Sequence, residues 1–258
     1  MIRSGNPALK ESTFLDLGSG TVVSRDAGAM TLNGTVNKTG ILLLLSVLTA
    51  AFAWTQSVVT GPDGTAMVAP GVTIYALGGA IGGFILAMVT VFKKTWSPVT
   101  APLYALVEGF FLGAISAVFE LKYPGIVFQA VVLTFGTLGA LLAAYRSGLI
   151  RATENFKLGV VAATGGIALV YLASIALGFF GIKIPLIHES GLVGIGFSLF
   201  VVVIAALNLV LDFDFIESGV EAGAPKYMEW YGAFGLMVTL VWLYIEFLRL
   251  LAKLQSRD

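Results

Sequence analysis

The chain of 258 residues has no cysteine and a single histidine. Without cysteine there can be no disulfide framework, no thiol nucleophile and no thiolate metal site. The histidine, His188, stands beside Glu189 in a predicted loop, and we interpret it as a solvated residue, with an external pH sensor as the alternative. Nucleophilic-serine motifs, zinc-binding histidine pairs and a Ser/His/Asp set are also missing. We therefore predict that the protein is not an enzyme and holds no cofactor.

Charge is scarce as well. Only 12% of the residues are charged, whereas 57% are hydrophobic, and the mean hydropathy of +0.93 lies well outside the usual balance of a soluble domain. The 15 basic and 15 acidic residues cancel, so no net field would attract nucleic acid. This composition indicates an integral membrane protein, with the lipid bilayer as a partner and no nucleic acid.

Long apolar runs supply the predicted secondary structure. A helix needs about 20 mostly apolar residues to cross the hydrocarbon core of a membrane. The loops between the runs are short and rich in turn residues, so none can hold a soluble domain. We predict an all-α polytopic protein with seven transmembrane helices, at residues 40–59, 70–92, 101–119, 126–145, 158–181, 191–212 and 231–252.

Basic residues are divided unequally between the two sides of this arrangement. Five lie on one side and ten on the other: Arg3, Lys10, Arg25, Lys38, Lys93, Lys94, Arg146, Arg151, Lys157 and Lys226. Because basic residues favour the cytoplasm, we predict a cytoplasmic N-terminus and an external C-terminus. An eighth segment or a re-entrant last span would return the C-terminus to the cytoplasm. The predicted domains are a polar cytoplasmic tail over residues 1–39, the membrane domain over 40–252 and a short tail over 253–258.

Glycines recur at helical spacing inside the predicted spans. Small residues three or four apart let helix backbones approach closely in lipid. None of the glycines is followed by the Lys-Ser/Thr pair of a phosphate-binding loop. We therefore interpret them as packing positions: Gly78, Gly79, Gly82, Gly83, Gly109, Gly113, Gly136, Gly139, Gly232 and Gly235.

Acidic residues lie within or at the ends of apolar spans, where a carboxylate is costly unless a partner offsets it. Glu108 stands about eight residues into the third span, roughly 10 Å inside its cytoplasmic boundary. Asp212 and Asp214 end the sixth span on the same side, about 200° apart on an ideal helix, so at most one points squarely inward. Lys93 and Lys94 close the second span in that layer. We predict that the acids form a gate or pH sensor, latched by one lysine; a static salt bridge is the alternative.

Two further acids are secondary candidates for that site. Glu246 lies toward the outer end of the last span, and Arg249 three residues later is its natural partner, which favours a structural pair. Glu229 lies in a hairpin that is acidic although its side of the membrane favours basic residues. Lys226 is the single basic residue of that hairpin.

Three motifs occur in order along the predicted spans. SPVTAPLYALVEGFFLGAIS leads from a polar turn into an aromatic helix that carries Glu108 in an E-G-x-x-L-G pattern. LDFDFIESG has Asp212 followed four residues later by Ile216, and WLYIEFLRLL ends the last span with aromatic, leucine and basic residues. Together they resemble the transmembrane Bax inhibitor motif family (Bax inhibitor-1/YccA-like) over about residues 30–252. The tail with MTLNGTVNKTG resembles a bacterial branch, which implies a bacterial inner membrane.

The resemblance implies a bundle whose last helix is surrounded by the other six, and a pH-sensitive leak of Ca²⁺. In the family, aspartates of the sixth and seventh spans share a proton and are latched by a basic residue at the end of the second span. Asp212 matches the first aspartate, with Asp214 as its rival, and Lys93 or Lys94 lies near the latch position. The seventh span has the apolar run YGAFGLMVTLVW where the second aspartate is expected. Glu108 is therefore the candidate for the second carboxylate.

The leading hypothesis is a passive, pH-modulated pathway for Ca²⁺, because carboxylates such as Asp212, Asp214 and Glu108 offer the oxygen ligands that this hard cation prefers. The alternative is a membrane interaction protein that modulates a membrane protease or a stress response without conducting ions. Its N-terminal tail would then be the handle for its protein partner. An ion-coupled transporter ranks last, because no pair of broken spans occupies corresponding halves of the chain.

Overall fold

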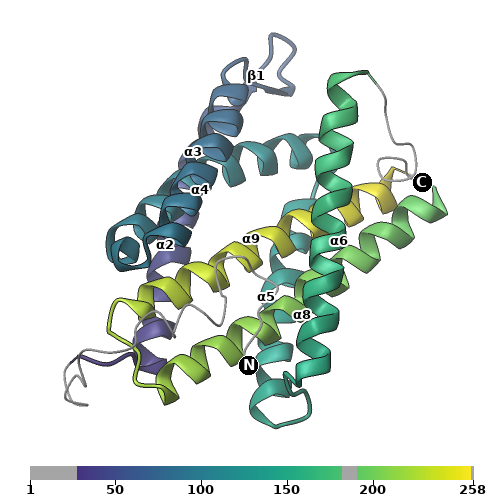
Figure 1. Ribbon diagram of the computed structural model, residues 1–258. Coiled ribbons are helices and arrows are strands. Elements are labelled where there is room, and N and C mark those ends of the chain that lie inside the picture. Colours follow the sequence, from purple (N-terminus) through teal and green to yellow (C-terminus); the bar gives the residue numbers. More distant parts are fainter. Residues whose placement is uncertain (1–27, 182–190, 257–258) are drawn as a thin grey trace. The chain divides into compact units, whose positions relative to one another are not determined.

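The computed structural model describes residues 28–181 and 191–256. Most of the predicted N-terminal tail, the loop with His188 and Glu189, and residues 257–258 lie outside the described residues. The elements, shown in Figure 1, are α2 (Leu32–Ser57), β1 (Val58–Thr60), β2 (Ala66–Val68), α3 (Val72–Phe92), the 3₁₀ helix η1 (Lys94–Trp96), α4 (Ser97–Lys122), α5 (Ile126–Arg146), α6 (Glu154–Phe179), α8 (Leu192–Glu221) and α9 (Met228–Gln255).

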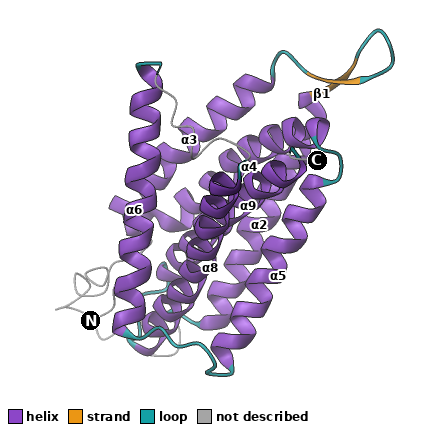
Figure 2. Ribbon diagram, turned by 90° about the vertical axis from the view of Figure 1, so that its right-hand side faces the viewer, coloured by secondary structure: helices purple, strands orange, loops and turns teal. Residues whose placement is uncertain are grey.

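The chain forms two compact units, which we describe separately. Unit 1 holds residues 128–181, 191–215 and 238–256, and unit 2 holds residues 28–127 and 216–237. The helices α8 and α9 contribute residues to both. Figure 2 shows that helices make up nearly all of the described chain, with one short hairpin of strands.

Seven helices in the described residues are long and apolar enough to cross a membrane, which confirms the predicted all-α fold with seven spans. Several helices extend beyond the predicted apolar runs, among them α2, which begins at Leu32 rather than at residue 40. At the start of α2, the side chain of Thr31 accepts a hydrogen bond from the N–H of Gly34, so the helix begins at Leu32. The last helix is the most buried span, with 67% of its apolar window buried compared with 11–50% in the others.

In unit 2, α4 packs against both α2 and α3. Glycines permit this close approach. A Cβ atom on Gly113 would overlap the backbone carbonyl of Ala50 in α2, and one on Gly79 would press on the backbone of Phe111 in α4. The packing interpretation is thus confirmed at these glycines, since their missing side chains let the helix backbones meet.

Other glycines of the predicted packing set have no such role. A Cβ added to Gly78, Gly136 or Gly139 would meet no heavy atom within 4 Å among the described residues. The packing interpretation is therefore wrong for these three positions. Helical spacing identifies a small-residue stripe, but it does not decide which stripe receives a neighbouring helix.

Unit 1 brings α6, α8 and α9 together around an apolar cluster. Ile167 of α6 packs with Val201 and Ile204 of α8, and Trp242 of α9 covers them. The side chain of Asn208 donates to the hydroxyl of Thr164, one turn from this cluster on each helix. Thr164 of α6 meets Asn208 of α8, and Ile167, later in α6, meets Ile204, earlier in α8, so the two helices are antiparallel.

The loop between α2 and α3 is a hairpin in which β1 and β2 pair antiparallel. Gly64 occupies the turn with a φ of 80°, a conformation that favours glycine. The Asp63 carboxylate accepts hydrogen bonds from the hydroxyl and the N–H of Thr65, at 2.7 and 3.2 Å. These bonds, the hydroxyl first, hold the pKa of Asp63 below its usual value.

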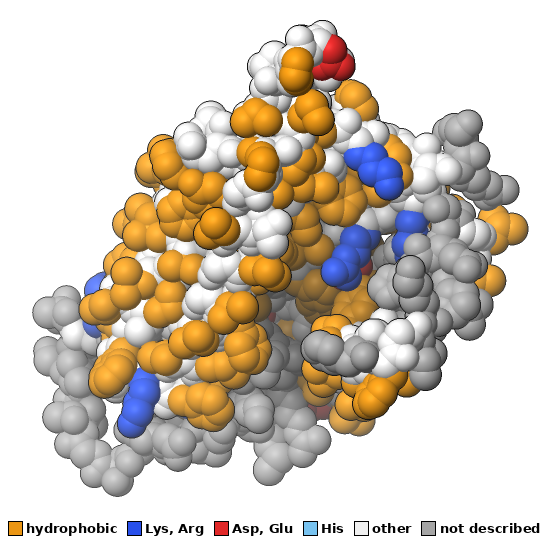
Figure 3. Space-filling model, turned by 90° about the horizontal axis from the view of Figure 1, so that it is seen from above, with side chains coloured by type: hydrophobic (Ala, Val, Ile, Leu, Met, Phe, Trp, Pro, Cys, Tyr) orange, Lys and Arg blue, Asp and Glu red, His pale blue; other side chains and the backbone are white. Residues whose placement is uncertain are grey.

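The surface of the helices is largely apolar. Figure 3 shows hydrophobic side chains across most of the face in view, with few basic groups among them. Examples are Ile74 and Phe84 of α3, Phe128 of α5 and Leu169 of α6, which are 64–75% exposed. Apolar area of this extent fits contact with lipid acyl chains.

The glycine contacts give a direct test of the packing of unit 2. We expect Gly113→Ala to lower the free energy of unfolding by about 1–3 kcal/mol, because its methyl group would enter the space of the Ala50 carbonyl. The matched change Gly136→Ala should be neutral or stabilise by up to about 1 kcal/mol. Thermal unfolding of both variants in detergent measures the difference. Equal effects of the two substitutions would contradict the predicted packing.

Candidate functional site

Asp212 lies in α8 and is completely buried, whereas the Asp214 side chain is 19% exposed. The predicted difference in direction between the two is therefore present, with Asp212 as the inward acid. Its neighbours Leu211 and Phe213 are also buried. A carboxylate in such surroundings carries a high desolvation cost, so its position needs an explanation beyond hydrophobic packing.

Asp214 forms an ion pair with Lys157 of α6 in unit 1. The Nζ of Lys157 lies 2.8 Å from Oδ2 of Asp214, and the lysine side chain is only 7% exposed. Glu154, one turn earlier in α6, lies 3.7 Å from the same Nζ and is largely exposed. The buried pair links α6 to α8 at the N-terminal end of α6 and the C-terminal part of α8.

Lys157 is a site residue that the sequence interpretation did not identify, because it counted this lysine among loop charges. The helix α6 begins at Glu154, and the Thr153 side chain accepts a hydrogen bond from the N–H of Phe156. Thr153 and Glu154 are a helix start signal, and recognising it would have placed Lys157 in the first turn of a helix. Its pairing with Asp214, which is 57 residues later in the chain, depends on tertiary packing and has no local sequence signal.

The predicted latch residues have a different setting. Lys93 is the C-cap residue of α3 and Lys94 begins η1, both in unit 2; Lys93 is exposed, and Lys94 is half-buried. The basic residue that holds Asp214 in this structure is Lys157. A latch between Lys93 or Lys94 and Asp212 stays a prediction.

Glu108 lies in α4 of unit 2 and is 8% exposed. Its carboxylate occupies the space that a side chain at Gly83 of α3 would fill. The glycine therefore gives the acid a place between α3 and α4. The predicted meeting of Glu108 with Asp212 stays a prediction.

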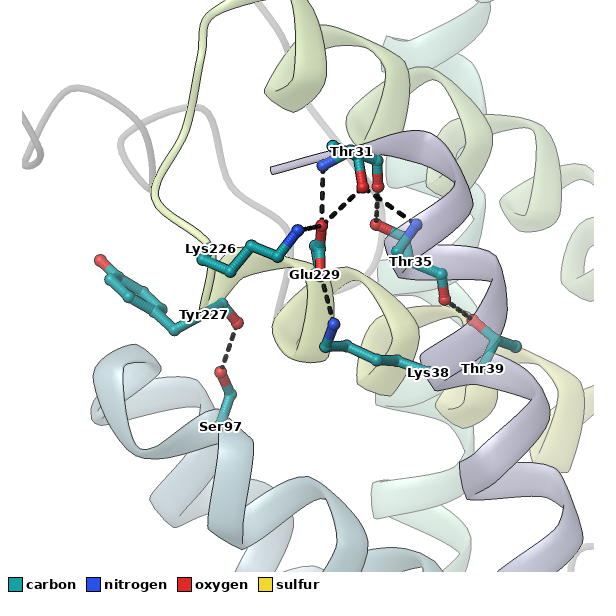
Figure 4. Close-up of polar contacts among 9 residues, drawn as sticks. Thr31, Thr35, Lys38, Thr39, Ser97, Lys226, Tyr227 and Glu229 are labelled. Carbon is teal, nitrogen blue, oxygen red and sulfur yellow. Dashed lines mark hydrogen bonds and ion pairs between the residues drawn. The ribbon is translucent and has the colours of Figure 1, made fainter. Parts of the chain in front are cut away.

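Glu229, a secondary candidate, is the centre of a polar network in unit 2 (Figure 4). Its side chain is completely buried and forms ion pairs with Lys38 and Lys226, the latter at 2.8 Å. The N–H and the hydroxyl of Thr31 donate to Oε1 at 2.9 and 2.7 Å. A buried carboxylate with four donors is fully compensated, so Glu229 joins the start of α9 to the start of α2.

Backbone hydrogen bonds extend this junction. The N–H of Met30 donates to the carbonyl of Ala224 at 2.6 Å, and the N–H of Lys226 donates to the carbonyl of Gly28 at 2.9 Å. The Ser97 hydroxyl donates to the carbonyl of Tyr227 at 2.9 Å. Burial raises the pKa of the Tyr227 phenol. The segment before α2 is thus fastened to the loop between α8 and α9, a feature without any local sequence signal.

Glu246 forms the predicted pair with Arg249, at 2.9 Å between Oε1 and the guanidinium. The hydroxyl of Tyr171 in α6 donates to the same oxygen at 3.0 Å, and the guanidinium carbon lies 5.3 Å from the Tyr171 ring centre. Further along α9, Lys253 donates to the carbonyl of Gly194 and to Ser198 of α8. A second polar region therefore joins α6, α8 and α9 in unit 1.

No group of three acidic or histidine side chains that could hold a metal ion occurs within the described residues. Asp212 and Asp214 belong to unit 1 and Glu108 to unit 2. Binding of Ca²⁺ by these three carboxylates together stays a prediction. The chemistry that the sites do offer is charge pairing and oxygen ligation inside membrane-length helices.

Comparison with known proteins connects this arrangement to a family. A family model described as Bax inhibitor 1 like matches residues 6–256 of the chain. The matched range includes all seven membrane-length helices of the described structure. No curated protein and no solved structure matches the chain.

The Glu229 network yields a stability prediction. We expect Glu229→Gln to lower the free energy of unfolding by about 1–3 kcal/mol, because Lys38 loses its buried counter-ion. Glu221→Gln removes an exposed carboxylate near the end of α8 and is the matched control, with an expected change within about 0.5 kcal/mol. Thermal unfolding in detergent compares them. A Glu229→Gln variant as stable as the control would show that the network contributes nothing to stability.

Proposed function

We propose that this chain, which belongs to the Bax inhibitor 1 like family, forms a passive, pH-modulated pathway for Ca²⁺. The proposed location is a bacterial inner membrane with the N-terminus in the cytoplasm. The observation that carries the proposal is the fully buried Asp212, two residues from the Asp214–Lys157 ion pair in a membrane-length helix. Ionisable residues inside membrane spans mark ion or proton pathways by default.

The arrangement of unit 1 supports this function. One polar layer contains Asp212 and the Asp214–Lys157 pair, and another contains the Glu246–Arg249 pair. Between them along the helices lies the apolar cluster of Ile167, Val201 and Ile204. Apolar constrictions between polar regions act as gates in channels by excluding water. The apolar cluster is therefore the proposed barrier of the closed pathway.

Charge pairing provides the proposed pH response. While Asp214 is ionised, its attraction to Lys157 holds α6 against α8. A proton shared by Asp212 with a second carboxylate would bias the balance between this charge-paired state and a released state. Glu108 is the proposed second carboxylate, and Lys93 or Lys94 an additional latch. Ca²⁺ is the permeant ion in this proposal, and the protein is neither an enzyme nor the holder of a resident cofactor.

Ion flux across proteoliposomes tests the sensor. We expect the wild-type Ca²⁺ leak to rise roughly fivefold or more from about pH 8 to about pH 5, equivalent to about 1 kcal/mol of bias between two states. Asp212→Asn mimics the neutral acid and should flatten this response to less than roughly twofold. Glu108→Gln should also reduce the rise of the leak at low pH if Glu108 is the second carboxylate.

Asp63→Asn makes the same chemical change in the exposed hairpin and is the matched control, with an expected wild-type response. A pH response that Asp212→Asn leaves unchanged would contradict the sensor role of Asp212. A wild-type protein without leak at any pH would contradict the proposed pathway as a whole.

A second candidate function is an interaction protein that modulates a membrane protease or another membrane protein. The specific observation in its favour is the fastening of residues 28–30, in the part of the tail nearest to α2, to the α8–α9 loop next to the Glu229 network. A partner that binds the tail would act on a junction that includes the starts of α2 and α9.

Deletion of residues 1–27 separates the two functions, since it keeps the fastened segment and the Thr31 cap. For a conducting protein we expect the truncated form to keep its pH-dependent leak within roughly twofold of wild type. For an interaction protein we expect loss of co-purification with the membrane protease, at unchanged thermal stability. Retained partner binding by the truncated protein would contradict a role of the tail as the handle.

A further inference from the structure

Asn208 of α8 is a buried polar residue that the sensor leaves unexplained. Its side chain is 1% exposed and lies in unit 1, one helical turn before Asp212. The Nδ2 amide nitrogen donates to the carbonyl of Ile204 at 2.8 Å and to the hydroxyl of Thr164 at 2.9 Å. The Oδ1 oxygen is buried and accepts no hydrogen bond from the described residues.

The orientation of this amide is fixed by its neighbours. The carbonyl of Ile204 can only accept a hydrogen bond, so the nitrogen of Asn208 must face it. Exchange of the amide oxygen and nitrogen would place two acceptors against each other. Oδ1 is therefore held at the opposite corner of the amide group, away from Ile204, as a preoriented acceptor.

The surroundings indicate which ligand this acceptor suits. Residues four apart on a helix lie on the same face, so Asn208 and Asp212 offer an amide oxygen and a carboxylate along one side of α8, and Thr164 adds a hydroxyl oxygen from α6. A group that contacts several such oxygens at once must be electropositive. Amide, carboxylate and hydroxyl oxygens together are ligands for a hard cation.

We propose that Asn208, Asp212 and Thr164 form a transient binding position for Ca²⁺, with Asn208 about one and a half turns before Asp214 in α8. The position lies next to the apolar cluster of Ile167, Val201 and Ile204. It rests on the proposed function, because it names where the permeant ion is held before it crosses that barrier. A single carboxylate in the set makes binding weak, as conduction requires.

Asn208 is a specificity-determining residue in this proposal, since its uncharged oxygen sets both the number of ligands and their total charge. Ligand charge is the main control on Ca²⁺ affinity at oxygen sites. Added charge at position 208 should therefore tighten binding and slow release, and removal of the oxygen should weaken binding.

Titration of the purified full-length protein with Ca²⁺ alone, in detergent, tests the site. We expect Asn208→Asp to bind Ca²⁺ roughly tenfold more tightly and Asn208→Leu roughly tenfold more weakly than wild type. Thr164→Val should weaken binding severalfold. The control Thr134→Val removes a buried hydroxyl of α5 that donates only to its own helix, to the carbonyl of Ala130, and should bind as wild type.

Thermal unfolding shows which variants are folded. If Asn208→Leu does not fold, the Ca²⁺ affinity of Asn208→Asp decides the outcome. Wild-type Ca²⁺ affinity in the folded Asn208 variants would overturn the site. A buried water would then be the partner of the amide oxygen. Because binding is measured without a membrane gradient, Ca²⁺ binding through Asn208 without any leak would overturn the proposed function alone. A pH-dependent leak with unaltered binding in both Asn208 variants would overturn the site alone.

Discussion

A polar group inside a membrane-length helix must find its partner within the protein, because lipid offers none. This constraint accounts for the contacts of the acids in both units. Asp214 has Lys157, Glu246 has Arg249 and a tyrosine hydroxyl, and Glu229 has four donors. Hydroxyls such as that of Thr134 satisfy the same requirement by donating to the carbonyl four residues earlier. Each acid thereby joins one helix to another, so the contacts that compensate the buried charges also hold the helices together.

Features that depend on local sequence could be predicted. Seven apolar runs of spanning length give the fold, and the spacing of Glu246 and Arg249 on one helix face gives their ion pair. The angle between Asp212 and Asp214 was sufficient to show that only one could point fully inward. In each case the information lies within a few residues, and helix geometry converts it into position.

Features that depend on the packing of distant helices could not be predicted. The partner of Asp214 is Lys157 rather than a lysine at the end of α3, and nothing near either residue specifies the pairing. Glu229 gave no sign of its four donors, because Thr31 and Lys38 come from the other end of the chain. Positive-inside counting treats every basic residue as a loop charge, and so it conceals those that are drawn into a helix as counter-ions.

The Glu229 junction also constrains how the protein is made. Lys38 and Glu229 are 191 residues apart, so the first span leaves the ribosome long before its counter-ion exists. At synthesis rates of about 5–20 residues per second, Lys38 waits roughly 10–40 s for Glu229. Throughout that interval the start of α2 lacks the acid that receives the Thr31 N–H and hydroxyl. The start of α2 is therefore completed only by the start of α9, so the chain must be translated as far as Glu229 before this junction can close.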